Sequence, residues 1–304
     1  MLSRRTFAGG LVAASAGLPN ILTAGKTRGP LRIGYFTDLH VRTEWQTPDG
    51  WKKAARLLEA EKTDFCICGG DMITDGFDAS AESVEPRWKV YFEGRDLISN
   101  DVYPVIGNHD LVGAIPADGS TPEEDPRRVF KEKMKLDSSW YSFDVAGYHF
   151  VALDPFEIGW EGASFRGYIS EEQQEWIRED LAKLSESTPI VLLSHVPFMT
   201  NYTQAVKGAL ANSSVRSVVN NSSTVMRLFS RHNLVAVLSG HLHVNEMMRW
   251  RNTTFITGGA VCAKWWRGPW HGTEEGVGVV TLDGNKVGWE YIDFQWEARR
   301  PPNK

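Results

Sequence analysis

The stretch LRIGYFTDLH, residues 31–40, is a short apolar and β-branched run that ends in two polar side chains, Asp38 and His40. Two more apolar runs follow, each separated from the one before by a segment of helical character. Residues 49–61 carry apolar side chains at helical spacing, and residues 82–98 form the second such segment. This strand–helix–strand–helix–strand order predicts a sheet with parallel strands and helices packed on it.

The second half of the chain is richer in strands. Residues 140–145 and 148–153 are joined at Ala146-Gly147, which predicts a hairpin, and Ser170 opens a helix through a capping box. The remaining predictions are strands at residues 190–193 and 234–238 and a final hairpin that turns at residues 283–285. Neither an internal repeat nor a linker is evident, so we expect one α/β domain over residues 31–295.

Ligand-type side chains gather where the predicted strands end. In open α/β sheets, ligands bind beyond the carboxyl ends of the strands, so these side chains should converge in space. Five of the eight histidines take part. The residues concerned are Asp38, His40, Asp71, Asn108, His109, Asp110, His195, His241 and His243.

The residue types and their spacing indicate a metal site. Imidazole and carboxylate groups suit divalent transition metals. A single spacer in Asp-x-His and in His-x-His lets both side chains point towards one side of a turn. Glycines before Asp71, Asn108 and His241 allow the backbone to approach closely where a Cβ would obstruct it. One carboxylate could bridge two metals about 3.5–4 Å apart, the spacing that clamps both oxygens of a phosphoryl displacement.

The strand-end residues form five motifs: Asp-x-His at 38–40, Gly-Asp at 70–71, Gly-Asn-His-Asp at 107–110, a lone histidine at 195 and Gly-His-x-His at 240–243. With these motifs in this order, the chain resembles the calcineurin-like metallophosphoesterases over about residues 31–250. The resemblance implies a two-sheet β-sandwich flanked by helices in four layers, with two divalent metal ions at the strand ends. It implies that Asp71 bridges the two metals. The first metal would be held by Asp38, His40, Asp71 and His243, and the second by Asp71, Asn108, His195 and His241.

The resemblance also implies a mechanism for hydrolysis of phosphate esters. A metal-activated hydroxide would attack phosphorus, and His109 would assist the leaving group while Asp110 orients the His109 ring. Capping of a helix is the other interpretation of Asp110. Purple acid phosphatases of this superfamily bind ferric iron through a tyrosine three residues after the bridging aspartate, where this chain has Thr74. A ferric tyrosinate is therefore not expected, and manganese, zinc and iron all remain candidates.

The segment Lys264–Gly272 is rich in tryptophan, glycine and proline. It predicts either core packing for the second sheet or a loop over the site. In the second case the candidate substrate contacts are Lys264, Trp266, Arg267 and His271.

A small phosphorylated molecule is the expected substrate, with phosphodiesters favoured over phosphomonoesters. The alternatives are a metal-dependent nuclease and a non-catalytic metal-binding protein of the same fold. The formal net charge of −5 disfavours nucleic acid as a partner, because such binding relies on Lys and Arg. The intact ligand set together with His109 argues against a non-catalytic protein. The oligomeric state is open.

The N-terminus resembles a twin-arginine export signal. Arg4 and Arg5 precede a short apolar stretch that is too brief to span a bilayer, and residues 1–24 are predicted to be the signal. We therefore expect a periplasmic or extracellular protein, with cleavage after Ala16 or Ala24. No other segment is long and apolar enough to be transmembrane. An odd number of cysteines argues against a disulfide scaffold.

Overall fold

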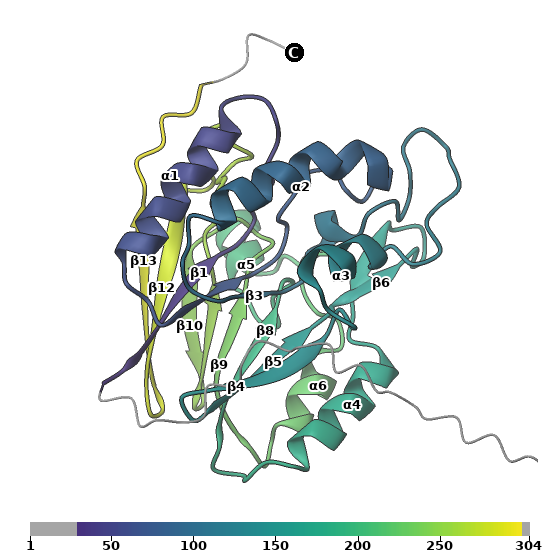
Figure 1. Cartoon of the computed structure of the whole chain (residues 1–304). Coiled ribbons are helices and arrows are strands. Elements are labelled where there is room, and N and C mark those ends of the chain that lie inside the picture. The colour runs from purple at the N-terminus through teal and green to yellow at the C-terminus, as the bar shows by residue number, and fades with distance from the viewer. Residues whose placement is uncertain (1–28, 300–304) are drawn as a thin grey trace, which may run out of the picture.

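Two β-sheets form the centre of the molecule in the computed structural model, which describes residues 29–299 (Figure 1). The predicted export signal lies outside the described residues. The first sheet has the order β13 (Lys286–Asp293), β12 (Gly276–Asp283), β1 (Leu31–Phe36), β2 (Phe65–Cys68), β3 (Val102–Pro104). The second has the order β10 (Glu246–Trp250), β11 (Thr253–Thr257), β9 (Asn233–Ser239), β8 (Pro189–Ser194), β5 (Tyr148–Leu153), β4 (Tyr141–Val145).

Alternation along the strands explains why the sheets pack face to face. In β1, Leu31, Ile33 and Tyr35 belong to a buried cluster shared with residues of the second sheet. Phe36 points the other way and packs with Trp51 of α1 (Thr47–Ala60), their ring centroids 5.2 Å apart. Both faces of this strand are therefore buried, as expected of a strand inside an α/β sandwich.

Helices cover the outer faces of both sheets (Figure 1). On the first sheet, α1 packs against α2 (Ala81–Arg95), and the Trp51 indole donates to the carbonyl of Tyr91 at 2.8 Å. Pro86 lies within α2 without ending it. The other helices are α3 (Arg128–Met134), α4 (Glu171–Leu181), α5 (Tyr202–Lys207) and α6 (Ser222–Leu228). The predicted helix-flanked two-sheet fold is confirmed.

The parallel strands bring their carboxyl ends to one edge of the sandwich. Strands β1, β2 and β3 are mutually parallel, and so are β5, β8, β9 and β11. Two short strands, β6 (Phe156–Ile158) and β7 (Phe165–Gly167), form a separate hairpin beyond β5. Within residues 29–299, no helix is long and apolar enough to cross a membrane.

Candidate metal centre

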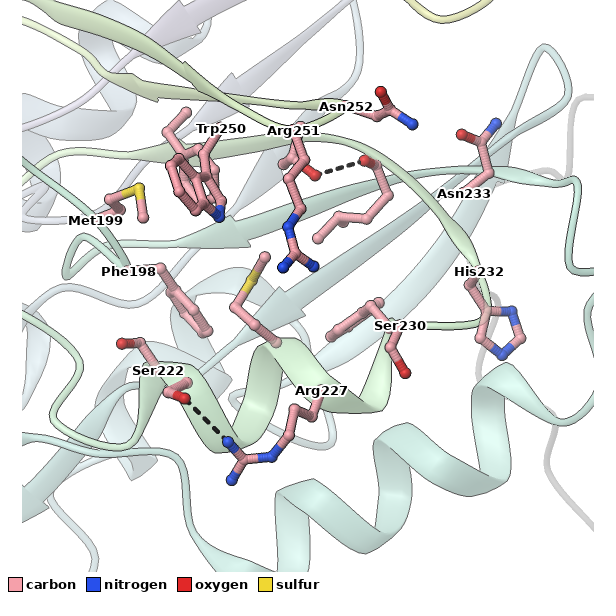
Figure 2. A pocket seen from close by; sticks show the side chains of 16 residues that line it. Phe198, Met199, Ser222, Arg227, Ser230, His232, Asn233, Trp250, Arg251 and Asn252 are labelled. Atoms are coloured by element: carbon pink, nitrogen blue, oxygen red, sulfur yellow. Dashed lines mark hydrogen bonds between the residues drawn. The ribbon is translucent and has the colours of Figure 1, made fainter.

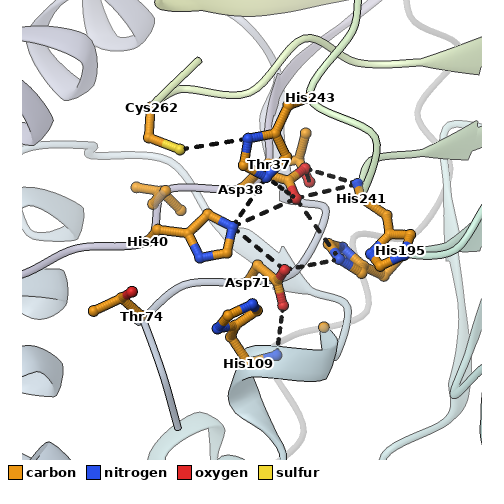
Figure 3. A network of polar contacts seen from close by, with 12 residues as sticks. Thr37, Asp38, His40, Asp71, Thr74, His109, His195, His241, His243 and Cys262 are labelled. Atoms are coloured by element: carbon orange, nitrogen blue, oxygen red, sulfur yellow. Dashed lines mark hydrogen bonds and ion pairs between the residues drawn. The ribbon is translucent and has the colours of Figure 1, made fainter. Parts of the chain in front are cut away.

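The strand-end residues meet in one buried cluster (Figure 3). One carboxylate oxygen of Asp71 lies 3.1 Å from His195 Nε2 and 3.4 Å from His40 Nε2. The Oδ1 atom of Asp38 lies 3.3 Å from His243 Nε2, and His40 Nε2 and His243 Nε2 are 3.1 Å apart. The nitrogens of three imidazoles therefore converge on two carboxylates, although their residues are far apart in the chain.

Asp71 belongs to two groups of side chains that could each hold a metal ion. It joins His40 and His109 in one group, and His195 and His241 in the other. In each group the ligand atoms all lie within 4.8 Å of one another. This shared position is the one that the resemblance implied for a bridging carboxylate.

The residues present fit a transition-metal centre. The side-chain oxygen of Asn108 is buried, and no hydrogen-bond partner for it lies among the described residues. A buried polar atom without a partner is costly, and a metal ion would satisfy it. The combination of imidazole, carboxylate and amide oxygen suits manganese, zinc or iron.

Backbone carbonyls hold the outer nitrogens of three of these imidazoles. His195 Nδ1 lies 2.8 Å from the carbonyl oxygen of Gly69, and His241 Nε2 lies 2.9 Å from that of Arg216. His243 Nδ1 contacts the carbonyl oxygen of Ala263. Since a carbonyl only accepts, each of these nitrogens carries a proton, and the other ring nitrogen is turned towards the cluster, where a metal ion would take the place of its proton.

The cluster's charges also shift its pKa values. Burial disfavours the imidazolium form of His195, but the carboxylates of Asp71 and Asp38 outweigh burial and raise its pKa to about 9. Burial, reinforced by the neighbouring His195, lowers the pKa of His241 to about 3. Burial would raise the pKa of Asp71, but His195 and His109 hold it below its usual value. Asp71 is therefore ionised, as a metal-bridging carboxylate must be.

Five of the seven predicted ligands have a left-handed backbone. The φ angles are 53° at Asp38, 43° at His40, 54° at Asp71, 70° at His241 and 58° at His243. Residues other than glycine rarely adopt this conformation, and it tends to cluster at functional sites where the surroundings enforce it.

Glycines allow the loops to come together. A Cβ on Gly107 would collide with the backbone nitrogen and carboxylate of Asp71, and one on Gly240 would collide with Thr37 and Asp38. The sequence prediction that these glycines permit close approach is confirmed.

His109 differs from the other histidines of the cluster. Its Nδ1 accepts a hydrogen bond of 2.9 Å from the backbone N–H of Asp75, so the ring proton resides on Nε2. Burial lowers the pKa of His109 to about 4, which keeps the ring neutral. The ring stands edge-on to His40, with centroids 4.5 Å apart. A neutral imidazole that presents an N–H can donate a hydrogen bond to an oxygen on which negative charge develops.

Asp110 does not orient the His109 ring, so that prediction is wrong. Its carboxylate instead accepts the backbone N–H groups of Asp71, Met72 and Gly107, each at 2.9 Å. It thereby ties the loop after β2 to the loop after β3. The capping interpretation comes closer, because the bond from Gly107 caps the short 3-10 helix Asn108–Asp110.

The tryptophan-rich segment contributes to both the core and the rim of the site. Trp266 is only 1% exposed, and its indole donates to the carbonyl of Leu39 at 2.9 Å. The prediction that Trp266 contacts substrate is therefore wrong. Its neighbour Trp265 lies beside His243 instead, with ring centroids 4.6 Å apart. Lys264, Arg267 and His271 are exposed, as a substrate contact requires.

Sequence reasoning missed two residues near the cluster. Cys262 is buried, with its sulfur 3.8 Å from His243 Nδ1, although it stands alone in the sequence. Trp265 was also missed, because no periodic pattern in an irregular loop indicates which of two adjacent tryptophans faces inward. Thr74, at the position of the missing tyrosine, is buried, and its hydroxyl accepts from Arg42 at 3.0 Å.

A cavity of about 550 Å³ lies elsewhere, between α6 and the strands β10 and β11 (Figure 2). Phe198, Arg227, Trp250 and Arg251 are among the residues that line it, and none of the predicted ligands does. This cavity is therefore separate from the metal centre.

Comparisons with known proteins give the family of the chain. Residues 31–245 match the family model "Calcineurin-like phosphoesterase". Purple acid phosphatase 22 of Arabidopsis thaliana is 29% identical over 72% of this chain and 46% of its own length, and purple acid phosphatase 15 is 28% identical over 54% and 29%. The chain thus spans less than half the length of these curated relatives.

Solved structures share the fold. A dimetal phosphatase from Danio rerio superposes with a TM-score of 0.59 at 16% identity, over 88% of this chain and all of its own. Purple acid phosphatase PPD1 from yellow lupin gives 0.55 at 15%, over 90% of this chain and 53% of its own. The chain belongs to the calcineurin-like phosphoesterase family of metal-dependent phosphoesterases.

Proposed function

We propose that this chain hydrolyses phosphomonoesters of small molecules at a centre of two divalent metal ions. The observation that carries the proposal is the position of Asp71, which is shared between two groups of potential ligands. Ion pairs at 3.1 and 3.4 Å to His195 and His40 place its carboxylate between the two halves of the cluster.

The residues of the site would take different roles in the reaction. When bound, two metal ions would supply an activated water and would neutralise the charge of the phosphate. The first metal ion would be held by Asp38, His40, Asp71 and His243. The second would be held by Asp71, Asn108, His195 and His241. His109 keeps a proton on Nε2 because the N–H of Asp75 occupies Nδ1, so it can donate a hydrogen bond that stabilises the charge on the departing oxygen. Asp110 keeps Asp71 and His109 in register by binding both loops.

The ester class rests on the named relatives. The sequence favoured phosphodiesters, but the similar curated proteins are called phosphatases, and nothing in them supports a diester preference. We therefore infer that monoesters are the better substrates.

Hydrolysis of p-nitrophenyl phosphate and of bis-p-nitrophenyl phosphate tests the proposal. Metal-free protein would be reconstituted with Mn²⁺, Zn²⁺ or Fe²⁺, and bound metal counted by elemental analysis. We expect metal-dependent turnover that prefers the monoester and is lost, together with bound metal, in Asp71→Ala. Asp144→Asn is the matched control, since Asp144 also pairs with a histidine but lies outside the centre. Two bound equivalents without turnover of either ester would contradict the proposal.

We also propose export through residues 1–24. Sequencing the N-terminus of protein recovered from outside the cytoplasm tests this, with Arg4→Lys/Arg5→Lys as the comparison. Recovery of the intact N-terminus from the cytoplasm alone would contradict it.

A further inference from the structure

Trp265 forms an aromatic wall on the His40–His243 side of the metal centre. Its ring centroid lies 4.6 Å from that of His243 and 6.0 Å from that of His40. Trp265 is half-buried, so it combines contact with the cluster and access to solvent. Trp270, also half-buried, stands edge-on to it at 6.1 Å.

The backbone holds Trp265 in this place firmly. Its φ angle is 48° and that of Trp266 is 62°, a conformation that bulky side chains avoid. The neighbouring Trp266 is anchored in the core, and Gly50 of α1 lies so close to its ring that a Cβ there would collide with it. The loop closes on itself through Lys264 N–H to Gly268 O at 3.0 Å, and Gly268 N–H donates to Glu275 at 3.0 Å. These contacts maintain the strained backbone and so fix the position of the Trp265 indole.

Lys264 and Arg267, on the same loop as Trp265, each lie over a further aromatic ring. Lys264 stands over the Trp270 ring at 5.4 Å, and Arg267 stands over the Trp45 ring at 5.2 Å. Arg42 lies over the same Trp45 ring at 4.6 Å, but it also pairs with Asp75 at 3.1 Å. The loop that carries Trp265 therefore combines aromatic faces with the positive charges of Lys264 and Arg267, which suits a planar ring linked to a phosphate group.

We propose that Trp265 stacks against a flat aromatic ring in the leaving group, so that the preferred substrates are phosphoesters of aryl or nucleoside alcohols. This inference rests on the proposed phosphoesterase function. Hydrolysis forms a bond from phosphorus to the water oxygen and breaks the bond to the alcohol oxygen. The proton lost by the water passes to that oxygen, and the Nε2–H of His109 donates a hydrogen bond to the oxygen as its charge develops. The ring would leave the site by separating from Trp265.

Paired substrates test the proposal. Phenyl phosphate is compared with cyclohexyl phosphate, and adenosine 5′-monophosphate with ribose 5-phosphate, so that each pair differs in the planar ring. The first pair attaches the ring directly and the second through a sugar, which separates the two sources of the aromatic group. Each ratio of kcat/KM would be measured for the metal-loaded parent, Trp265→Ala, Trp265→Phe and the control Trp250→Ala. Trp250 is 58% exposed and lines the separate cavity of Figure 2.

We expect Trp265→Ala to lower at least one aromatic-to-saturated ratio by about 3- to 10-fold, the range of a lost aromatic contact. Trp265→Phe should restore most of the ratio, and Trp250→Ala should keep the parental ratio. Calorimetry with phenylphosphonate and cyclohexylphosphonate gives the same comparison without turnover, and Trp265→Ala should remove the preference for phenylphosphonate.

Two results would overturn the inference. One is a parental ratio for both substrate pairs in Trp265→Ala. The other is an equal loss for both members of each pair together with a loss of bound metal, which would make Trp265 a support for His243. Failure of the proposed function gives a different result, because the parent itself would then hydrolyse none of the four esters.

Discussion

Two clusters in this molecule pair histidine with aspartate, and they differ in what holds the ring nitrogens. In the first, between β5 and α4, His149 is buried, with Nδ1 2.8 Å from Asp144 and Nε2 2.9 Å from Asp180. Both nitrogens donate to carboxylates, and no lone pair is left for a metal. Burial opposes the charge, but the two carboxylates outweigh it and raise the pKa of His149.

In the metal centre, the backbone holds one ring nitrogen of four of the five histidines, and the other nitrogen of each ring faces the cluster. A carbonyl partner, as for His195 and His241, turns the other ring nitrogen towards the cluster, as a metal ligand requires. A backbone N–H partner, as for His109, turns an N–H towards the cluster, as a hydrogen-bond donor requires. The group that contacts the outer nitrogen thus separates three proposed roles that the residue type alone does not: metal ligand, hydrogen-bond donor and structural ion pair.

The largest expected effect is on the hydrogen-bond donor His109. His109→Ala should lower kcat by roughly 10²–10³-fold, the usual cost of removing a donor that stabilises developing charge, while both metal ions stay bound. Steady-state kinetics with metal analysis of the same sample checks this. The matched control is His149→Gln, which should keep the parental kcat per folded molecule. Loss of metal from His109→Ala would assign His109 to the ligands instead.

A smaller effect is expected where the backbone supports a ligand. Gly107→Ala places a Cβ against the backbone and carboxylate of Asp71, and should weaken metal affinity by about 10- to 100-fold, the range for disturbed outer contacts. Competition with a chelator measures this. At Gly29 a Cβ meets nothing within 4 Å, so Gly29→Ala is the control. Parental affinity in Gly107→Ala would show that the two loops need not approach closely.

The structural cluster should affect stability rather than chemistry. His149→Gln is expected to lower the free energy of unfolding by about 1–3 kcal/mol, the range for hydrogen bonds to charged groups. Because the folded-state pKa of His149 is raised, its stabilisation is complete below about pH 6.5 and is lost as the pH rises through the raised value. Urea unfolding at a series of pH values measures the difference in the free energy of unfolding between proteins with His149 and with His149→Gln. Both proteins would carry Asp71→Ala, which is expected to remove bound metal. A difference that grows with pH would refute the assignment.

The smallest expected signal concerns iron. With Thr74 where purple acid phosphatases have tyrosine, the iron-loaded oxidised protein should lack the visible absorption of a ferric tyrosinate. Absorption spectra of the parent and of Thr74→Tyr check this. Arg42, which donates to the Thr74 hydroxyl, is expected to hinder a tyrosine there, so even the variant should colour weakly. A purple parent would mean that another tyrosine reaches the metal.

The strands and most of the cluster could be predicted from the sequence because their determinants are local. The apolar runs that became β1 and β5 begin and end where predicted, and parallel strands necessarily bring their ends to one edge. The short helices α3 and α5 and the hairpin β6–β7 lack a long periodic pattern and were missed. The roles of Asp110 and Trp266 depend on contacts between distant segments, which local pattern does not encode.

The left-handed backbone at five ligands has a consequence for how such a protein could change over time. At each of these positions, an aspartate or a histidine adopts a backbone conformation that glycine adopts more readily. A descendant released from catalysis could exchange them for glycine and relieve the backbone while losing its metals. The present chain keeps a carboxylate or an imidazole at every one of the five, against the preference of its own backbone. Stability and activity pull in opposite directions at these turns, so a screen for thermal resistance alone would select against the centre.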